Sequence, residues 1–356
     1  MEDMGLNADL WAGRRVFLTG HTGFKGSWMA LLLHRLGAEV SGYSLAPATD
    51  PSLYDMAGIA GVMASSTIAD IRDGDNLRRA MAAADPDIVI HMAAQALVGV
   101  GYDDPVGTFA TNVMGTVNLF EAVRALDRPV GVVNVTSDKC YDNREWVWPY
   151  RENDPLGGRD PYSASKGCAE IVSAAYRASF LEQVGISLAT ARAGNVIGGG
   201  DWSEARLIPD ALRAFDADQP LKLRSPASVR PWQHVLEPIV GYLMLAQAMI
   251  GGQDVAGAWN FGPAQSGVRP VGEVVGLLHA ALGVAANTRT APVDWHEANA
   301  LTLDSSKAWA QLRWQPRWGL EKAVAQTAAW HLAVKSGTPA KDVCLQQIGA
   351  YLAEVA

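Results

Sequence analysis

The chain has 356 residues, of which 49% are hydrophobic and 19% charged, and a formal net charge of −8. This length allows a packed core in one elaborated domain or two. The acidic balance argues against DNA or RNA as a partner, because nucleic acids bind clustered Lys and Arg, but it leaves room for a local basic pocket around a small phosphate ligand.

Cysteine usage and apolar runs exclude further classes. Cys140, Cys168 and Cys344 form no CxxC pair, so neither a zinc site nor a disulfide scaffold is indicated. The first residues lack a basic segment followed by an apolar run, and no stretch approaches about 18 uninterrupted apolar residues. We therefore expect no metal, no signal peptide and no membrane span, and a location in the reducing cytoplasm.

Up to about residue 193, short apolar runs alternate with helical patterns. Strands are predicted at residues 16–18, 40–43, 88–90, 131–135 and 186–191. Helices are predicted at residues 27–36, 75–84, 108–126 and 162–181, with Gly37 closing the first of them. This alternation predicts an α/β fold with a Rossmann-type, doubly wound parallel sheet.

After residue 194 the pattern becomes less regular. Helices are predicted only at residues 271–282 and 320–331, and the intervening loops and short elements are marked by Gly198-Gly199-Gly200, Pro209, Pro220, Pro226 and Pro231. We expect a dinucleotide-binding domain of residues 1–192 plus about 235–262. Residues 193–234 plus about 263–356 are expected to form a smaller α/β substrate domain packed closely against it.

A glycine-rich loop follows the first predicted strand and opens the first predicted helix. Glycines three residues apart permit a tight turn and let the backbone approach a pyrophosphate, while the helix N-terminus supplies N–H groups and partial positive charge. Within it, His21 and Lys25 either add contacts to phosphate or face solvent. The residues expected to bind the cofactor here are Gly20, His21, Thr22, Gly23, Phe24, Lys25 and Gly26.

The second predicted strand leaves the identity of the dinucleotide open. It ends at Gly42-Tyr43-Ser44-Leu45, with no acidic residue for a ribose 2′-hydroxyl and no Arg for a 2′-phosphate. The choice between NAD and NADP is therefore not settled at this position.

Tyr162 and Lys166 form a YxxxK pattern in a predicted helix. Residues four apart share a helix face, so the Lys166 ammonium should favour the phenolate and lower the pKa of Tyr162 towards neutrality. Such a tyrosine can take the proton of a sugar hydroxyl while hydride leaves the carbon. The pattern predicts an oxidoreductase-type catalytic pair.

These motifs, in this order, resemble the extended branch of the short-chain dehydrogenase/reductase family, the NAD-dependent epimerases and dehydratases. The loop is similar to the TGxxGFxG of that branch, and residues 304–308 and 312–316 resemble its C-terminal signature. The resemblance covers nearly the whole chain and implies NAD as cofactor. It also implies that the helices at 108–126 and 162–181 pair across a two-fold axis in a homodimer.

The resemblance also assigns roles to individual residues. Ser137 would hydrogen-bond the reacting hydroxyl, and Asp70 would contact adenine unless it is a turn or cap residue. The remaining cofactor contacts implied are Ile71, Ala93, Ala94, Asn112, Tyr162 and Lys166. The substrate contacts implied are Gln95, Asn195, Arg206, Leu207, Arg230 and His234. Arg230 would bind phosphate, with a surface ion pair as its alternative.

The segment Ser137-Asp138-Lys139 narrows the expected activity. Most sugar-nucleotide 4,6-dehydratases carry Asp-Glu here, the Asp as acid on the C6 hydroxyl and the Glu as base on the C5 proton. Lys139 in place of the Glu resembles the branch members that dehydrate CDP-glucose. The resemblance thus implies a lyase that converts CDP-glucose to its 4-keto-6-deoxy product by internal hydride transfer through NAD, in deoxysugar or O-antigen-type biosynthesis.

Several alternatives stay open. Lys139 can be the C5 base only if its pKa is lowered, and otherwise it acts electrostatically on Asp138. Asp138 and Lys139 could also be a structural ion pair. A dehydratase or epimerase for GDP-mannose or dTDP-glucose is the alternative enzyme, although Asp138 argues against simple epimerisation. A non-catalytic dinucleotide-binding regulator is opposed by the intact Tyr162 and Lys166 pair.

Overall fold

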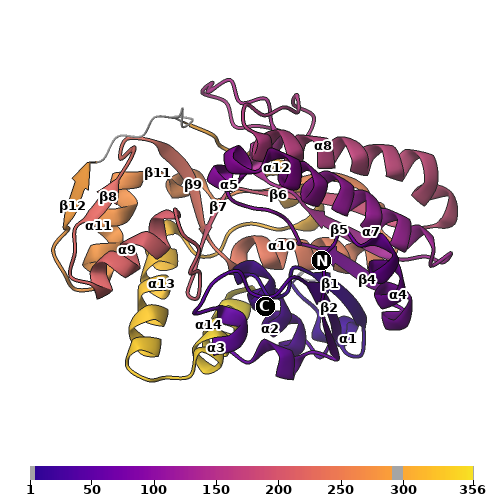
Figure 1. Cartoon of the computed structure of the whole chain (residues 1–356), viewed down its shortest axis with the longest axis horizontal. Helices are drawn as coiled ribbons and strands as arrows, with labels where there is room; N and C mark the ends of the chain where they lie inside the picture. Colours follow the sequence, from indigo (N-terminus) through magenta and orange to yellow (C-terminus); the bar gives the residue numbers. More distant parts are fainter. Residues whose placement is uncertain (1–4, 291–299, 356) are drawn as a thin grey trace.

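Seven parallel strands form the central sheet of the computed structural model, which describes residues 5–290 and 300–355 (Figure 1). In spatial order the strands are β10 (Gly257–Phe261), β6 (Ser187–Ala193), β5 (Gly131–Val135), β4 (Ile88–His91), β1 (Arg15–Thr19), β2 (Glu39–Ser44) and β3 (Ser65–Ile68). The chain order reverses between β1 and β4, and ligands of such sheets bind beyond the carboxyl ends of the strands at that point. The predicted α/β fold with a doubly wound parallel sheet is confirmed.

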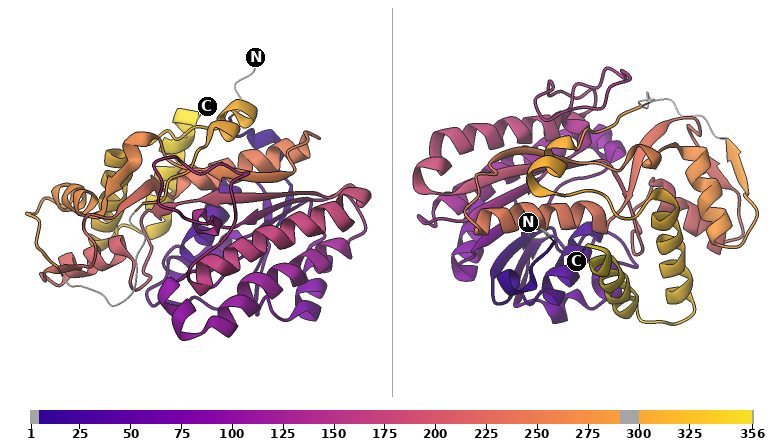
Figure 2. Two further views of the ribbon diagram at one scale, coloured as in Figure 1. Left: turned by 90° about the horizontal axis from the view of Figure 1, so that it is seen from above. Right: turned by 180° about the vertical axis from the view of Figure 1, so that it is seen from behind.

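Helices cover both faces of this sheet (Figure 2). One layer contains α4 (Gly74–Ala84), α7 (Gly115–Arg124) and α8 (Pro161–Tyr176). The other contains α2 (Phe24–Arg35) and α10 (Leu236–Ile250), with α12 (Ser306–Leu312) and α14 (Ala340–Val355) packed outside them. Residues late in the chain therefore return to the large sheet, and the predicted division into two domains stays a prediction.

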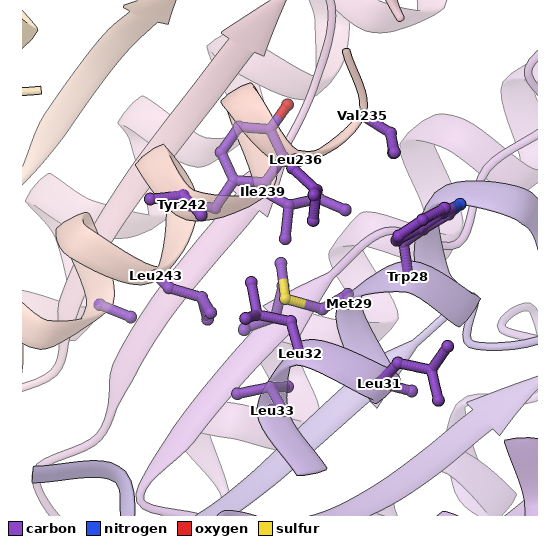
Figure 3. Close-up of a cluster of buried hydrophobic side chains, with 14 of the residues drawn as sticks. Trp28, Met29, Leu31, Leu32, Leu33, Val235, Leu236, Ile239, Tyr242 and Leu243 are labelled. Carbon is purple, nitrogen blue, oxygen red and sulfur yellow. The ribbon is translucent and has the colours of Figure 1, made fainter. Parts of the chain in front are cut away.

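The packing of α2 against α10 fixes where the glycine-rich loop sits. Residues 26–33 of α2 are all buried, because the sheet, α10 and α14 enclose the helix. Met29 and Leu32 lie against Leu236 and Ile239 in this layer (Figure 3). Each fully buried aliphatic side chain contributes roughly 1.5–3 kcal/mol, so the start of α2 is held firmly.

The two long helices predicted at residues 108–126 and 162–181 are continuous but not uniform. The first runs from α6 (Pro105–Phe109) through a π-helical turn, η2 (Ala110–Met114), into α7. The second, α8, ends in another π-helical turn, η4 (Arg177–Leu181). π turns inside helices re-aim side chains and often occur at functional sites, and η2 carries Asn112.

A smaller lobe lies beside the carboxyl ends of the large sheet (Figure 1). Its strands are β7 (Asn195–Ile197), β9 (Val229–His234) and β11 (Val268–Pro270) in one sheet, and β8 (Leu221–Leu223) with β12 (Thr288–Thr290) in another. Its helices are α9 (Leu207–Asp216), α11 (Val271–Ala281) and α13 (Leu320–Lys335). One apolar cluster joins α9, α11 and α13 to β7, β8 and β9.

Four helices of the second half, α9, α10, α12 and α14, were not predicted. The sequence of α10 is apolar on nearly all sides, so it lacks the amphipathic period that marks a helix. Pro209 lies in the first turn of α9, where a missing N–H costs little. The short elements are α1 (Ala8–Trp11), α3 (Leu53–Met56), η1 (Ile59–Val62), α5 (Val98–Asp103), η3 (Asp138–Cys140), η5 (Glu182–Val184) and η6 (Gln265–Gly267).

Among residues 5–290 and 300–355, no helix combines the length and apolarity needed to span a bilayer. The same residues contain no group of His, Cys, Asp and Glu side chains arranged to hold a metal ion.

Candidate active site

The glycine-rich loop between β1 and α2 is shaped by backbone contacts. Gly20 has a φ of 78°, and a Cβ there would lie 2.7 Å from the Ala93 nitrogen. A Cβ on Gly26 would lie 2.0 Å from the Gly20 carbonyl oxygen, so the loop closes only with glycine at both positions. Gly23 is different, since its nearest neighbour to a Cβ is the Gly20 oxygen at 3.4 Å.

Gly23 is also the N-cap of α2, and it makes no side-chain capping hydrogen bond. The first-turn N–H groups of a helix have no intrahelical partner, and with the helix dipole they attract anions. An exposed glycine at this point lets a ligand approach the backbone closely. The loop therefore fits the pyrophosphate of a dinucleotide.

The side chains of His21 and Thr22 point towards the neighbouring strands β2 and β3. The Nε2 atom of His21 lies 2.8 Å from the Ser66 hydroxyl, and the ring packs where a Cβ on Gly42 would lie. Burial lowers the pKa of His21 to about 4, so the ring is neutral at pH 7. The alternative that His21 faces solvent is wrong, because the residue is buried, and its contact with phosphate stays a prediction. The Thr22 hydroxyl donates to the Leu45 carbonyl at 2.8 Å and ties the loop to the end of β2.

The Lys25 side chain extends from the loop towards α10. Its ammonium lies 5.9 Å from the centroid of the Tyr242 ring on α10. Burial lowers the pKa of Lys25 to about 8, with Arg206 and Lys166 acting in the same direction and Asp138 against it. Phe24, its neighbour, packs against the Gly198 loop, where a Cβ would lie 3.3 Å from the Phe24 ring.

The residues predicted to contact adenine follow β3. The Asp70 carboxylate accepts a hydrogen bond from the Arg72 guanidinium at 2.5 Å, and this partner holds the pKa of Asp70 below its usual value. Ile71 is buried and packs on Gly115 of α7, where a Cβ would lie 2.6 Å from it. Ile71 therefore lies mainly in the core, and the adenine contacts stay predictions.

A hydrogen-bond network joins the segment after β4 to η2 and α8. The Asn112 amide donates to the Gln95 carbonyl at 3.0 Å and to the Ser165 hydroxyl at 2.8 Å, and it accepts from the Gln95 N–H at 2.9 Å. The Gln95 side chain is also engaged, with Thr108 and the Leu97 N–H. These bonds hold the half-buried Ala93 and Ala94 beside the Tyr162 helix.

The predicted catalytic residues meet at the end of β5. The Ser137 hydroxyl donates to Asp138 Oδ1 at 3.1 Å, and the Lys139 ammonium lies 6.0 Å from the centroid of the Tyr162 ring. The Lys166 ammonium donates to the Val135 carbonyl at 3.4 Å. Burial raises the pKa of Asp138, although Lys139, Ser137 and Arg230 act against it.

Burial also controls the titration of Tyr162 and Lys166. It raises the pKa of the Tyr162 phenol, and neither Ser137 nor Arg206 outweighs it. It lowers the pKa of Lys166 to about 8. The sequence prediction that the phenol pKa is lowered is therefore wrong for this structure, because loss of hydration exceeds the effect of the nearby cations.

Apart from Gln95, which follows β4, the residues predicted to bind substrate come from the second half of the chain. Asn195 opens β7 opposite Trp232, and Arg230 is almost buried on β9. Arg206 precedes α9, forms an ion pair with Asp201 at 3.4 Å and acts on both Lys25 and Tyr162. Leu207 begins α9 and packs against its apolar cluster.

His234 is packed between aromatic side chains. It is fully buried, and its ring lies 5.8 Å from the Trp28 ring and 4.9 Å from the Trp318 ring, centroid to centroid. Burial lowers its pKa to about 3. The two indoles therefore hold the imidazole in place, and the predicted substrate contact of His234 stays a prediction.

A buried ion pair behind the site was missed in the sequence. Glu170 and Arg192 are 2.7 Å apart, with 3% of each side chain exposed. Glu170 also accepts from Thr136 at 2.5 Å and from Thr190 at 2.7 Å, so the pair joins α8 to the ends of β5 and β6. Its position four residues after Lys166, on the same helix face, was the available signal.

Sequence comparison relates this chain to nucleotide-sugar enzymes. The family model described as GDP-mannose 4,6 dehydratase matches residues 17–327. A CDP-glucose 4,6-dehydratase of Salmonella typhimurium is 49% identical over 354 residues, covering 98% of each chain. A dTDP-glucose 4,6-dehydratase of Streptomyces antibioticus is 29% identical over 329 residues, covering 89% of this chain and 92% of the relative.

Solved structures share the fold. A dTDP-glucose 4,6-dehydratase from Streptomyces venezuelae with NAD bound has a TM-score of 0.78 at 24% identity, covering 90% of this chain and 98% of that one. A UDP-glucose 4-epimerase from Thermotoga maritima with UDP-glucose has a TM-score of 0.79 at 20% identity, covering 90% and 99%.

Proposed function

The chain belongs to the GDP-mannose 4,6 dehydratase family of nucleotide-sugar enzymes, and from this premise we propose that it is an NAD-dependent CDP-glucose 4,6-dehydratase. The observation that carries the choice of substrate is the 49% identity over 98% of both chains to a relative of that activity. The Ser137-Asp138-Lys139 segment at the end of β5 supports the same choice.

NAD is the proposed cofactor because the backbone of Gly20, Gly23 and Gly26 fits a pyrophosphate and the related dehydratase structure holds NAD. Bound there, NAD would supply reversible hydride transfer between C4 and C6 of the sugar, so the reaction would have no net redox change. The first turn of α2 would hold the phosphates, with Tyr162 and Lys166 at the reactive end.

Tyr162 would accept the proton of the C4 hydroxyl, and Ser137 would hydrogen-bond the same oxygen. Asp138 would give a proton to the departing C6 hydroxyl. Its raised pKa suits that role, because a carboxyl group that keeps its proton closer to neutral pH can donate it. The 4-keto group acidifies C5, so loss of water across C5 and C6 follows oxidation at C4.

Lys139 is proposed to act electrostatically on Asp138 and not as the C5 base. It opposes the burial effect on the Asp138 pKa and lies beside the Tyr162 ring. A lysine base would need a strongly lowered pKa. Lys139 thus helps to set how readily Asp138 gives up its proton.

The test is incubation of the enzyme and NAD with CDP-, dTDP- and GDP-hexoses in parallel, followed by mass measurement of the products. Loss of one water from CDP-glucose alone, with no net NADH, is the expected result. Dehydration of another nucleotide sugar in preference, or epimerisation without loss of mass, would contradict the assignment.

We also propose a homodimer. Apolar side chains are exposed on neighbouring elements of the α7–α8 layer and can form a self-complementary interface. They are Tyr102, Val106, Phe109, Met114, Ile171 and Phe180. Light scattering should give twice the chain mass for the wild type and a monomer for Ile171→Glu, whereas Val284→Glu, an exposed site on the other lobe, should leave the dimer intact.

The cellular setting is proposed on chemical grounds. Cys140, Cys168 and Cys344 all lie in the described part of the chain and are unpaired thiols, as expected in the reducing cytoplasm. The 4-keto-6-deoxy product is a precursor type for deoxysugars, which suits polysaccharide biosynthesis of the O-antigen kind.

A further inference from the structure

Tyr242 of α10 ends in a hydroxyl that has no hydrogen-bond partner among the described residues, although the residue is 0% exposed. Leaving a buried donor unpaired costs about 1–3 kcal/mol, and buried polar groups are normally bonded. Other buried tyrosines follow that rule, since the hydroxyls of Tyr43, Tyr141 and Tyr351 donate to Asp70, Asn260 and Glu237 respectively. The Tyr242 hydroxyl therefore lacks the hydrogen-bond partner within the described residues that these other tyrosines have.

The ring of Tyr242 is held firmly by apolar neighbours. It packs edge-on against Phe261 at the end of β10, with 5.6 Å between ring centroids. Figure 3 shows the phenol oxygen at the end of the ring that points away from Met29 and Leu32. A phenylalanine would fill the same apolar space, so packing explains the ring but not the hydroxyl.

The Tyr242 side chain lies near the ionisable groups of the candidate active site. The Lys25 ammonium lies 5.9 Å from the Tyr242 ring centroid. Asp138 and Tyr162 both act electrostatically on the hydroxyl, adding to the burial that raises its pKa. The carboxylate of Asp138 in turn lies where a Cβ on Gly194, at the end of β6, would come within 3.1 Å. Asp138, just after β5, thus lies against the end of β6 and close enough to Tyr242 to act on it electrostatically.

We propose that the Tyr242 hydroxyl is a ligand-binding group of the active site, which donates a hydrogen bond to an uncharged oxygen of a bound molecule. That oxygen is a hydroxyl or carbonyl oxygen of the hexose, or the carboxamide oxygen of the nicotinamide cofactor. A neutral phenol is a donor suited to such an oxygen, whereas the anionic phosphates have their own site at the start of α2. The identity of these ligands rests on the proposed function.

The variant Tyr242→Phe tests the inference because it keeps the ring and removes only the hydroxyl. Ligand-free enzyme should melt at the same temperature as the wild type or slightly higher, since an unpaired buried group is lost. Ligand binding should weaken on the order of tenfold, the worth of one hydrogen bond. Lower NAD affinity by calorimetry would identify the carboxamide, and lower kcat/KM with unchanged NAD affinity would identify the hexose.

The matched control is Tyr351→Phe. The Tyr351 hydroxyl is buried on α14 and donates to Glu237 at 2.5 Å, so its loss should lower the melting temperature and leave NAD affinity and kcat/KM unchanged. The inference is overturned if Tyr242→Phe destabilises the ligand-free enzyme as the control does. It is also overturned if the variant keeps both the NAD affinity and the kcat/KM of the wild type. Inactivity of the wild type on CDP-glucose would instead reject the proposed function, while the melting and NAD measurements would still test Tyr242.

Discussion

The two ends of the candidate active site differ in the groups that they offer to a ligand. The glycine-loop end, Gly20 to Gly26, offers backbone and a neutral histidine, because His21 is buried with a pKa of about 4. The catalytic end, formed by Lys25, Asp138, Tyr162 and Lys166, crowds ionisable side chains whose pKa values burial has shifted. Main-chain N–H groups suit binding because their charge does not depend on pH, whereas proton transfer needs groups that titrate near the working pH. Burial moves the pKa values of Asp138 and Lys166 towards that range and the pKa of Tyr162 away from it.

Loss of the Tyr162 hydroxyl should give the largest effect at the catalytic end. Tyr162→Phe removes the proposed proton acceptor, and we expect kcat to fall on the order of 10²–10⁴-fold, the usual worth of a positioned acid or base. NAD affinity should stay close to that of the wild type, since the glycine-loop end is untouched. Near-normal turnover would break the contrast between the two ends.

Asp138 and Lys139 sharpen the same contrast by separating elimination from oxidation. In Asp138→Asn, loss of water should stop while Tyr162, Ser137 and Lys166 still support oxidation at C4, so NADH absorbance should accumulate with CDP-glucose. Lys139→Ala should slow dehydration but retain exchange of the C5 proton with deuterium, if Lys139 acts electrostatically. Full dehydration by Asp138→Asn would remove Asp138 from the mechanism, and lost exchange in Lys139→Ala would make Lys139 the base.

Two glycines test the glycine-loop end. Gly26→Ala places a Cβ 2.0 Å from the Gly20 carbonyl, and the forced backbone shift should lower the free energy of unfolding by about 3 kcal/mol or more. Gly23→Ala meets its nearest atom at 3.4 Å and should fold normally but bind NAD more weakly. Denaturant unfolding and calorimetry distinguish these outcomes. Equal stability of the two variants would show that the loop does not close as described.

The smallest effect concerns the neutral histidine. The folded-state pKa of His21 is about 4, below the unfolded value of 6.5, so between these values the unfolded chain binds the extra proton and stability falls as pH falls. His21 should contribute a loss of about 2 kcal/mol between pH 7 and pH 5. Glu237 acts oppositely, because its pKa is raised to about 7.

Comparison of His21→Gln with the wild type by urea unfolding at pH 5 and pH 7 isolates the histidine from Glu237. The variant should lose less stability on acidification. An unchanged pH dependence would mean that His21 is not buried in neutral form.

Local pattern was enough for much of this protein. The strand, glycine loop and helix at Gly20–Gly26, the Tyr162 and Lys166 pair on one helix, and the alternation that specifies a doubly wound sheet all depend on neighbours within a few residues. Such features follow from steric limits and periodicity, which the sequence carries directly. The family resemblance rests on the same short segments.

Tertiary structure decided the electrostatics. The direction of the Tyr162 pKa shift, the neutrality of His21, the enclosure of His234 and the Glu170–Arg192 ion pair all depend on which distant segments exclude water from a side chain. The same is true of Tyr242, whose ring lies near Lys25 only because α10 packs against α2. Desolvation is a property of the assembled core, so the spacing of residues along the chain does not encode it.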